Sequence, residues 1–159
     1  MYAITGITGN VGGATANALL NAGKKVRGVV RDKAKAADWE KAGVELVVAD
    51  INDANALTKA FRGCEAVFVM VPPNFDPLPE FPEARATGAR LKSVLEAARP
   101  ECAVYLSTIG AQANQSNLLS QHGIIEQPIS SLTMPLAILR PAWFLENCSW
   151  DVGPAREGG

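Results

Sequence analysis

Four glycines stand close together near the start of the chain, in the stretch TGITGNVGG at residues 5–13. Gly6, Gly9 and Gly12 are three residues apart, directly after a short apolar run and at the start of a helical pattern. Glycine permits positive φ and close approach of a ligand, because it has no Cβ. Backbone N–H groups at such a turn, together with the positive end of a helix, bind phosphate. The spacing predicts a site for the pyrophosphate of a nucleotide, and a tight turn without a ligand is the alternative.

A cluster of cations follows the second apolar run, which ends VVRDKAK at residues 29–35. An acid at this place accepts from the ribose 2′-hydroxyl of NAD, whereas the 2′-phosphate of NADP needs a cation. The guanidinium of Arg31 can bind a phosphate in bidentate fashion, and Lys33 and Lys35 add charge nearby. This favours NADP(H) over NAD(H), although Asp32 would reach the ribose if the register differed slightly. A solvated basic loop is the alternative for the two lysines.

Two later strand-like runs also end in residues that could contact a ligand. Asp50 and Ile51 follow the third run, where the carboxylate or the Ile51 backbone would lie beside an adenine. Helix capping by the same ADIND segment is an equal explanation. Ser107 and Thr108 follow the fifth run and could hydrogen-bond a substrate oxygen or a nicotinamide, or simply close the strand.

The order of the elements indicates the fold that must position these residues. Apolar runs typical of strands occur at residues 2–5, 25–30, 44–49, 66–71, 103–108 and 136–140. Helical patterns occur between them at residues 11–22, 53–62 and 82–99. Near-continuous Val and Ile runs separated by helices predict parallel strands that are covered on both faces. The predicted class is α/β, a doubly wound Rossmann fold with about six strands.

The composition limits the domain organisation and the partners. The chain has 159 residues, of which 48% are apolar and 19% are charged, which predicts one globular domain over residues 1–159. The net charge of −1 and the lack of a strongly basic window give no reason to expect nucleic acid or a membrane as partner. A small molecule or a protein is the expected partner.

The cysteines indicate the compartment. Cys64, Cys102 and Cys148 lie far apart and lack the CxxC spacing of a metal site, so we expect no metal and free thiols that are buried. Unpaired cysteines fit the reducing cytoplasm, and no apolar run at the start or elsewhere predicts a signal peptide or a membrane span.

Several stretches together resemble the NmrA-like family of atypical short-chain dehydrogenases/reductases. They are TGITGNVGG at 5–13, VVRD at 29–32, VAD at 48–50 and ILRPAWFLEN at 138–147. That family includes NADPH-dependent quinone-reductase-like enzymes and NADP-sensing regulatory proteins. The resemblance implies cofactor contacts at Gly6, Thr8, Gly9, Asn10, Val11 and Gly12 for the pyrophosphate, Arg31 for the 2′-phosphate, and Val71 and Pro72 for the ribose. It also implies that Phe144, Glu146 and Asn147 lie near the nicotinamide and the substrate entrance.

The helix expected to carry the catalytic groups departs from the wider superfamily. Ordinary members use Tyr-x-x-x-Lys, in which a phenol moves the substrate proton and the ammonium lowers its pKa. If Glu126 is matched to the family's glutamate, His122 takes the lysine position and Leu118 the tyrosine position. Some quinone-reductase-like members also carry His here, so His122 and Glu126 are the candidate catalytic residues, able to hydrogen-bond one turn apart. An exposed polar pair is the alternative, and Tyr105, within a strand pattern, is expected in the core.

The last part of the chain departs from the family in two ways. Pro128 cannot continue a helix without losing a hydrogen bond, so the preceding helix should end or kink near Gln127. After Asn147, relatives continue into a C-terminal substrate lobe, which we expect to be absent here. An apolar patch that predicts a homodimer or a protein partner would then consist of Trp143, Phe144 and Trp150. Burial beneath a short helix from about Ser149 is the alternative.

Two functions of different class follow. The first is an oxidoreductase that transfers a hydride from NADPH to a quinone-like acceptor, with Ser107, Phe144 and Asn147 toward the substrate. An electron-poor carbonyl demands mainly positioning, and water or His122 supplies the proton. The second is a non-catalytic protein that senses NADP and binds a protein partner. The missing tyrosine and lobe favour the second, whereas His122 with Glu126 favours the first, which is our main expectation.

Overall fold

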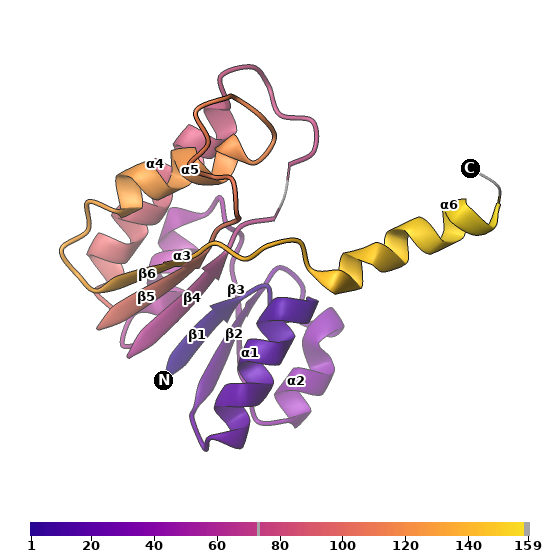
Figure 1. Cartoon of the computed structure of the whole chain (residues 1–159). Coiled ribbons are helices and arrows are strands. Elements are labelled where there is room, and N and C mark those ends of the chain that lie inside the picture. Colours follow the sequence, from indigo (N-terminus) through magenta and orange to yellow (C-terminus); the bar gives the residue numbers. More distant parts are fainter. Residues whose placement is uncertain (73, 158–159) are drawn as a thin grey trace.

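A parallel sheet of six strands forms the centre of the molecule. The computed structural model describes residues 1–72 and 74–157, except for the side chains of Trp150 and Asp151. The strands are β1 (Tyr2–Thr5), β2 (Val26–Val30), β3 (Glu45–Val48), β4 (Ala66–Met70), β5 (Cys102–Leu106) and β6 (Leu136–Leu139). All neighbours pair in parallel, in the order β3-β2-β1-β4-β5-β6 (Figure 1). This is the strand order of the Rossmann fold, so the predicted class is confirmed.

Helices connect the strands as expected. They are α1 (Asn10–Asn21), α2 (Ala37–Lys41), α3 (Ala54–Phe61), α4 (Pro82–Ala98) and α5 (Ser120–Ile129). A 3-10 helix, η1 (Ala34–Ala36), leads directly into α2, and neither was predicted because so short a segment shows no periodicity. The chain ends in η2 (Leu145–Asp151) and α6 (Val152–Arg156), which project away from the sheet (Figure 1).

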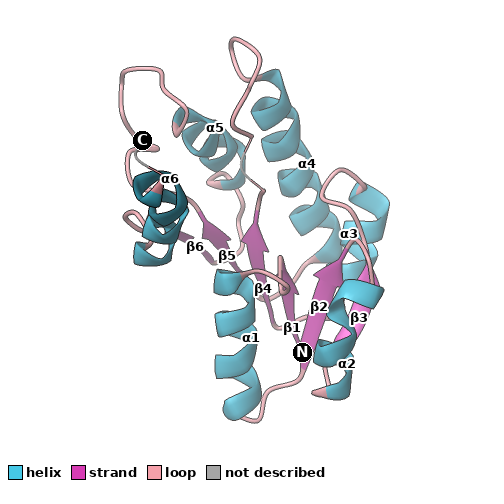
Figure 2. Cartoon of the chain, turned by 90° about the vertical axis from the view of Figure 1, so that its right-hand side faces the viewer, coloured by secondary structure: helices cyan, strands magenta, loops and turns pink. Residues whose placement is uncertain are grey.

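The helices form a layer on each face of the sheet, and each layer has its own core. Helices α1 and α2 lie on one face, and α3, α4 and α5 lie on the other (Figure 2). The first face buries Ile4, Ile7 and Val26. The second and larger core includes Phe61 and Tyr105. Both layers leave free the edge of the sheet where the strands end, and there the candidate site lies.

Helix α5 continues through its proline and ends two residues after Gln127, near which an end or kink was expected. It includes Pro128 and ends at Ile129, and Ser130 N still donates to the Glu126 carbonyl oxygen at 2.8 Å. The proline ring packs against α4, where a Cβ added to Gly88 would lie 2.7 Å from Pro128 Cγ. The one hydrogen bond lost in the last turn is therefore accompanied by close packing between two helices.

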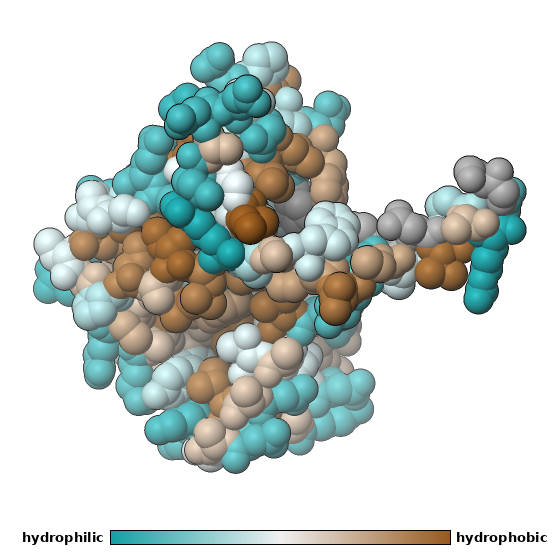
Figure 3. Space-filling model, viewed as in Figure 1, coloured by the Kyte–Doolittle hydropathy of each residue, from teal (hydrophilic) through white to brown (hydrophobic). Residues whose placement is uncertain are grey.

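The face of the sheet that carries α1 is only partly covered. Strand register places Phe68, Val104 and Ala137 in one row across β4, β5 and β6, on the face that α1 covers farther along the sheet. Phe68 and Val104 are half-buried and Ala137 is exposed. Leu139, two residues farther along the edge strand, is 48% exposed. Apolar surface gathers over these strands (Figure 3).

The cysteines only partly follow expectation. Cys64 is buried, whereas Cys102 is half-buried and Cys148 is exposed, so burial was predicted correctly for the first alone. In the described part of the chain, no group of three His, Cys, Asp or Glu residues could hold a metal ion. Within the same residues, no helix combines the length and the apolar character needed to cross a membrane.

Candidate cofactor site

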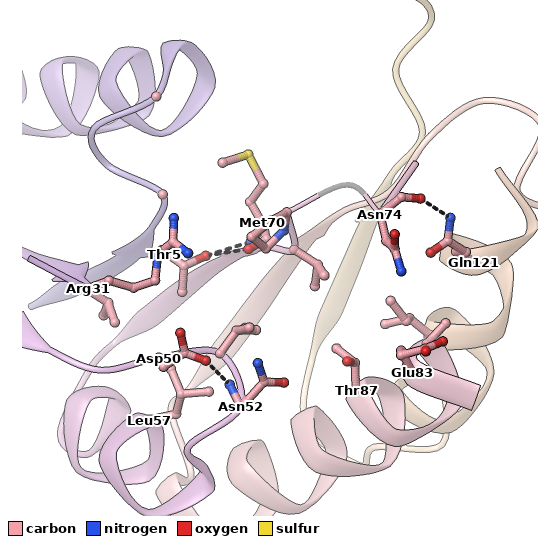
Figure 4. A pocket seen from close by; sticks show the side chains of 18 of the residues that line it. Thr5, Arg31, Asp50, Asn52, Leu57, Met70, Asn74, Glu83, Thr87 and Gln121 are labelled. Atoms are coloured by element: carbon pink, nitrogen blue, oxygen red, sulfur yellow. Dashed lines mark hydrogen bonds between the residues drawn. The ribbon is translucent and has the colours of Figure 1, made fainter. Parts of the chain in front are cut away.

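A cavity of about 930 Å³ opens at the carboxyl ends of the strands, beside β1 and β4. From β1 the chain adds β2 and then β3 toward one edge of the sheet. It then returns to the other side of β1 and adds β4, β5 and β6 toward the opposite edge. Loops diverge at such a switch point, which is where doubly wound sheets bind ligands. Figure 4 shows side chains from β1, β2, β4 and the neighbouring helices around this space. Its volume lies in the usual range for small-molecule sites.

The glycine turn forms one wall of the cavity and follows the predicted physics. Gly6 has a φ of +68°, as expected for a turn that only glycine adopts easily. Gly9 N donates to Gly6 O at 3.0 Å, and Gly9 is the N-cap of α1. A Cβ on Gly12 would lie 2.2 Å from Gly6 O, so its absence allows the helix to pack on the turn. Gly6, Thr8 and Gly9 line the cavity.

The other residues predicted at the pyrophosphate belong to the first turn of α1. Asn10, Val11 and Gly12 are in that turn but do not line the cavity. Within the described residues, the turn therefore faces the cavity with Gly6, Thr8 and Gly9. The N-terminus of α1 lies directly behind them.

A hydrogen-bonded link between β1 and β4 was not predicted. Thr5 Oγ1 donates to Met70 O at 3.1 Å and accepts from Met70 N at 2.7 Å (Figure 4). The side chain thereby satisfies backbone groups of β4 where the two strands separate. Both residues line the cavity. A threonine as the last residue of a strand, directly before the glycine turn, was the available signal.

The cations after β2 separate into two groups. Arg31 and Lys35 are exposed and line the cavity, whereas Lys33 does not. Asp32 also lines it, but its Oδ1 accepts from Ala34 N, two residues farther along the chain, at 2.9 Å. One carboxylate oxygen of Asp32 is therefore engaged within its own loop. Arg31 and Lys35 provide the positive charge on this wall of the cavity.

In the ADIND segment, residues 49–53, Asp50 stabilises a turn and Asp53 caps a helix. Asp50 Oδ1 accepts from Asn52 N at 2.8 Å, and Asp53 Oδ1 accepts from Ala56 N at 2.9 Å as the N-cap of α3. Capping is thus performed by Asp53, while Asp50 and Ile51 line the cavity. Asp50 lies with Arg31 and Asn52 on the same side of the space (Figure 4).

The opposite side of the cavity is built by the loop after β4 and by the start of α5. Val71 and Pro72, predicted beside the ribose, line it. Farther along the loop, Asn74 O accepts from Gln121 Nε2 at 2.9 Å, which ties the loop to α5 (Figure 4). The other residues on this side that the sequence did not suggest include Phe75, Glu83, Thr87 and Leu119.

His122 lines the cavity, but it is paired differently from the expectation. Its Nδ1 lies 2.8 Å from Tyr105 Oη on β5. This corrects the expected hydrogen bond between His122 and Glu126. Tyr105 is in the core as predicted, being 1% exposed, and its hydroxyl contacts His122 from there. Burial lowers the pKa of His122, and the nearby charge of Glu126 opposes that change.

Glu126 is buried and forms a polar cluster outside the cavity. Its carboxylate accepts from Arg140 Nε at 2.9 Å, and also from Arg140 Nη2 and Ser107 Oγ. Burial alone would raise the pKa of Glu126, but the hydrogen bonds from Arg140 and Ser107 outweigh it and lower the pKa. The cluster joins α5 to the ends of β5 and β6. Neither Glu126 nor Ser107 lines the cavity.

The predicted substrate residues near the end of the chain lie elsewhere. Phe144 and Asn147 are half-buried and Glu146 is exposed, and none of the three lines the cavity. Of the expected aromatic patch, Trp143 is 64% exposed, and the side chain of Trp150 lies outside the described residues. The structure therefore places His122 with the glycine turn and Arg31, but does not bring Phe144, Asn147 or Ser107 to them.

Comparison with known proteins identifies the family of the chain. Residues 6–152 match the model of a protein family described as NAD(P)H-binding. Quinone oxidoreductase 2 of Escherichia coli K12 is 26% identical over 164 residues, covering 100% of this chain and 54% of that protein. An NAD(P)H azoreductase of Xenophilus azovorans is 26% identical over 160 residues with the same coverage. An NmrA-like family domain-containing oxidoreductase of Cladobotryum is 30% identical, covering 92% of this chain and 47% of its own length.

Solved structures give the same result for the fold. The NADPH-dependent quinone oxidoreductase of Escherichia coli, in complex with NADPH, has a TM-score of 0.82 and 25% identity over 99% of this chain and 54% of its own. The triphenylmethane reductase of Citrobacter with NADP(H) has a TM-score of 0.83 over 99% of this chain and 55% of its own, at 24% identity. The expected resemblance to NmrA-like and quinone-reductase-like proteins is confirmed, and the chain spans about half the length of the curated relatives it matches.

Proposed function

The chain belongs to the NAD(P)H-binding family, and from that premise we propose that it is an oxidoreductase that uses NADP(H) to reduce a quinone-like acceptor. The observation that carries the proposal is one cavity lined by the glycine turn, by Arg31 and by His122. These are a phosphate-binding turn, a cation for a second phosphate and a polar group for the acceptor. The alternative of a non-catalytic sensing protein has no comparable support, because the relatives named above are enzymes.

The residues of the cavity fit a dinucleotide phosphate. The glycine turn, which lines the cavity with Gly6, Thr8 and Gly9, would hold the pyrophosphate, and Arg31 with Lys35 would hold the 2′-phosphate. Asp50 and Ile51 would contact the adenine, and Val71 and Pro72 the ribose. When bound, the reduced nicotinamide supplies a hydride.

The acceptor is inferred from what the cavity offers for proton transfer. The phenol in the vicinity, Tyr105, is buried behind His122 and does not line the cavity. A ketone needs a strong acid at its oxygen, whereas a quinone is already electron-poor and needs mainly correct distance and angle. A quinone-like acceptor is therefore the class that suits these residues, with water or His122 at its oxygen.

Binding and turnover test the proposal separately. NADPH, NADP⁺, NADH and NAD⁺ are titrated calorimetrically, and oxidation of NADPH is then followed at its absorbance band with a panel of quinones. We expect saturable binding, tighter for the phosphorylated cofactors, and NADPH oxidation with at least one quinone. Tight binding without turnover on any acceptor would eliminate the enzyme but keep the cofactor site.

We also propose that two copies of the chain associate in a reducing cytoplasm. The partly covered row of Phe68, Val104 and Ala137 ends on the edge strand β6, and an unpaired edge beside apolar surface favours association. Leu139, which is 48% exposed, extends this surface. The exposed Cys148 suits a compartment that keeps thiols reduced.

A further inference from the structure

A buried phenol and a histidine that faces the cavity form a pair that the proposed function does not explain. Tyr105 Oη lies 2.8 Å from His122 Nδ1, and the two rings are 6.0 Å apart between centroids. Tyr105 is 1% exposed and does not line the cavity, whereas His122 does. The pair thus connects the core strand β5 to the cavity through one imidazole ring.

The need of both buried groups for a hydrogen-bond partner determines whether Tyr105 or His122 donates. Within the described residues, His122 Nδ1 is the hydrogen-bond partner of the Tyr105 hydroxyl. If Nδ1 carried the ring proton, the phenol would accept it, and its own O–H would have no acceptor in the protein interior. Leaving a buried donor unsatisfied is costly, whereas a phenol that donates to Nδ1 satisfies both groups. The ring proton then belongs on Nε2, the nitrogen that remains for the cavity.

The surroundings keep both members of the pair uncharged at neutral pH. Burial lowers the pKa of His122, with Glu126 acting in the opposite direction. Burial also raises the pKa of Tyr105, and Glu126 adds to that increase. An imidazolium and a phenolate are therefore both disfavoured. Neutral imidazole with a fixed tautomer is a known way to place a hydrogen-bond donor beside a carbonyl.

We infer that Tyr105 is a positioning residue that holds neutral His122 in the Nε2–H tautomer, as a hydrogen-bond donor to a ligand oxygen in the cavity. The inference rests on the proposed function only for the identity of that ligand. The oxygen belongs either to a ribose hydroxyl of the cofactor or to the carbonyl of the acceptor, which share the same acceptor chemistry.

In this role His122 donates a hydrogen bond to the ligand oxygen but does not transfer its proton. In reduction of a quinone, the acceptor gains a hydride, which carries two electrons, and one proton from solvent to give the hydroquinone, while NADPH becomes NADP⁺. His122 stabilises the negative charge that develops on the oxygen and keeps its own proton. Giving up that proton would leave an imidazolate, or would require the proton of Tyr105, whose pKa is raised by burial.

The chain has one histidine, so ¹⁵N NMR of the imidazole reads this residue alone. At neutral pH we expect Nε2 to be protonated, Nδ1 to be an unprotonated nitrogen in a hydrogen bond, and the Tyr105 hydroxyl proton to exchange slowly and show a nuclear Overhauser contact to the ring. In Tyr105→Phe we expect the bonded signature of Nδ1 to disappear and a population protonated at Nδ1 to become measurable. Protonation of Nδ1 in the unsubstituted protein would overturn the inference, whatever the variant does.

A matched control and a ligand titration complete the test. Tyr2→Phe removes the other tyrosine of the chain, on β1, and should leave the histidine signals unchanged. The Nε2–H resonance is then followed as NADP⁺ is added, and after it duroquinone. A shift with NADP⁺ alone identifies a cofactor oxygen, and a shift that needs duroquinone identifies the acceptor; both support the donor role. No shift with either in a protein shown calorimetrically to bind NADP⁺ would overturn it.

These readouts do not depend on turnover. If NADPH is never oxidised but the tautomer is Nε2–H and its signal responds to NADP⁺, the proposed acceptor is wrong and the role of Tyr105 stands. If NADPH is oxidised but Nδ1 is protonated, the proposed function stands and the role of Tyr105 is wrong.

Discussion

At the scale of single residues, the proposed preference for NADP(H) depends on Arg31. It lines the cavity at the end of β2, whereas Lys33, two residues later, does not. Asp32, which could have favoured NAD, has one carboxylate oxygen engaged with Ala34 N. We therefore propose that a 2′-phosphate would be held by one guanidinium with support from Lys35.

Charge reversal at this residue tests that preference. In Arg31→Glu we expect the Kd of NADP⁺ to rise about ten- to a hundredfold, since a hydrogen bond to a charged group contributes roughly 1.5–3 kcal/mol. The Kd of NAD⁺, which has no 2′-phosphate, should change far less. Lys33→Glu is the matched control, because it makes the same charge change outside the cavity. Equal losses for the two cofactors in Arg31→Glu would show that Arg31 does not contact the 2′-phosphate.

Gly12 tests the packing of the glycine turn. A Cβ there would lie 2.2 Å from Gly6 O and 2.6 Å from Gly6 C, which are backbone atoms that cannot move aside easily. Gly12→Ala should lower the free energy of unfolding in urea by about 1–3 kcal/mol, or more, because it overpacks this contact. In Gly153→Ala the added Cβ meets nothing within 4 Å, so that variant should keep full stability. Equal stability of both variants would contradict the close helix approach.

Sequence reasoning predicted residues that have short-range signals and missed those positioned by tertiary contacts. The positive φ of Gly6 and the N-cap role of Asp53 follow from local patterns. The contact between Tyr105 and His122 joins residues seventeen positions apart on different elements, and only the packing of α5 against β5 creates it. His122 was therefore paired with Glu126, its neighbour on the helix, and that pairing was incorrect.

At the scale of elements, the cluster of Glu126, Arg140 and Ser107 fixes α5 relative to the ends of β5 and β6. The approach of α5 also depends on glycine, because a Cβ on Gly123 would lie 2.1 Å from Ala111 O. His122 precedes this contact by one residue. Helix α5 is thus held in place by packing at Gly123 and by the buried carboxylate of Glu126. This sets the position of the His122 side chain.

Stability as a function of pH tests the cluster. Since the pKa of Glu126 is lowered in the folded protein, its contribution should be complete above the unfolded pKa of about 4.3 and should be lost as pH falls through the folded pKa. Glu126→Gln should cost about 1.5–3 kcal/mol of unfolding free energy at pH 7, and the difference from the unsubstituted protein should shrink below about pH 4.

An exposed ion pair provides the control for this variant. Asp38 and Lys41 pair at 2.9 Å with side chains that are 94% and 76% exposed, and such pairs contribute little. Asp38→Asn should therefore leave unfolding in urea almost unchanged. A cost for Glu126→Gln that is no larger, or one that does not vary with pH, would mean that the cluster does not stabilise α5.

The parallel sheet and the two helical layers followed from the sequence because alternation and apolar runs are repeated signals. The short pair η1 and α2 had no such signal. The helix α5 extended past Pro128 because its ring packs at Gly88 of α4, which no local rule indicates. The loop after β4 lines the cavity with Asn74, whose carbonyl oxygen accepts from Gln121 on α5, and no local pattern indicates this contact between distant residues.

At the scale of the whole molecule, the sheet is covered unevenly. Helix α1 lies over β1 and β2 and helix α2 over β3 on one face, while apolar surface remains over β4, β5 and β6 (Figure 3). The segment formed by η2 and α6 projects away from this surface (Figure 1). This unevenness, rather than the aromatic residues near the end of the chain, is the main structural reason to expect association.

Sedimentation velocity tests association directly. The unsubstituted chain should show a sedimentation coefficient that rises with concentration, and Leu139→Lys should lower this dependence by placing a charge on the edge strand. Leu78→Lys, at an exposed leucine in the loop between β4 and α4, is the control and should behave like the unsubstituted chain. A monomer at every concentration would refute self-association.

The central claim is that the cavity beside β1 and β4 holds NADPH, and an amide ¹H–¹⁵N titration tests it most directly. Addition of NADPH should shift, in a saturable way, the amide resonances of Gly6, Thr8, Gly9, Arg31 and Ile51, and leave those of α6 unchanged. Shifts confined to other parts of the chain, or none at millimolar NADPH, would contradict the account.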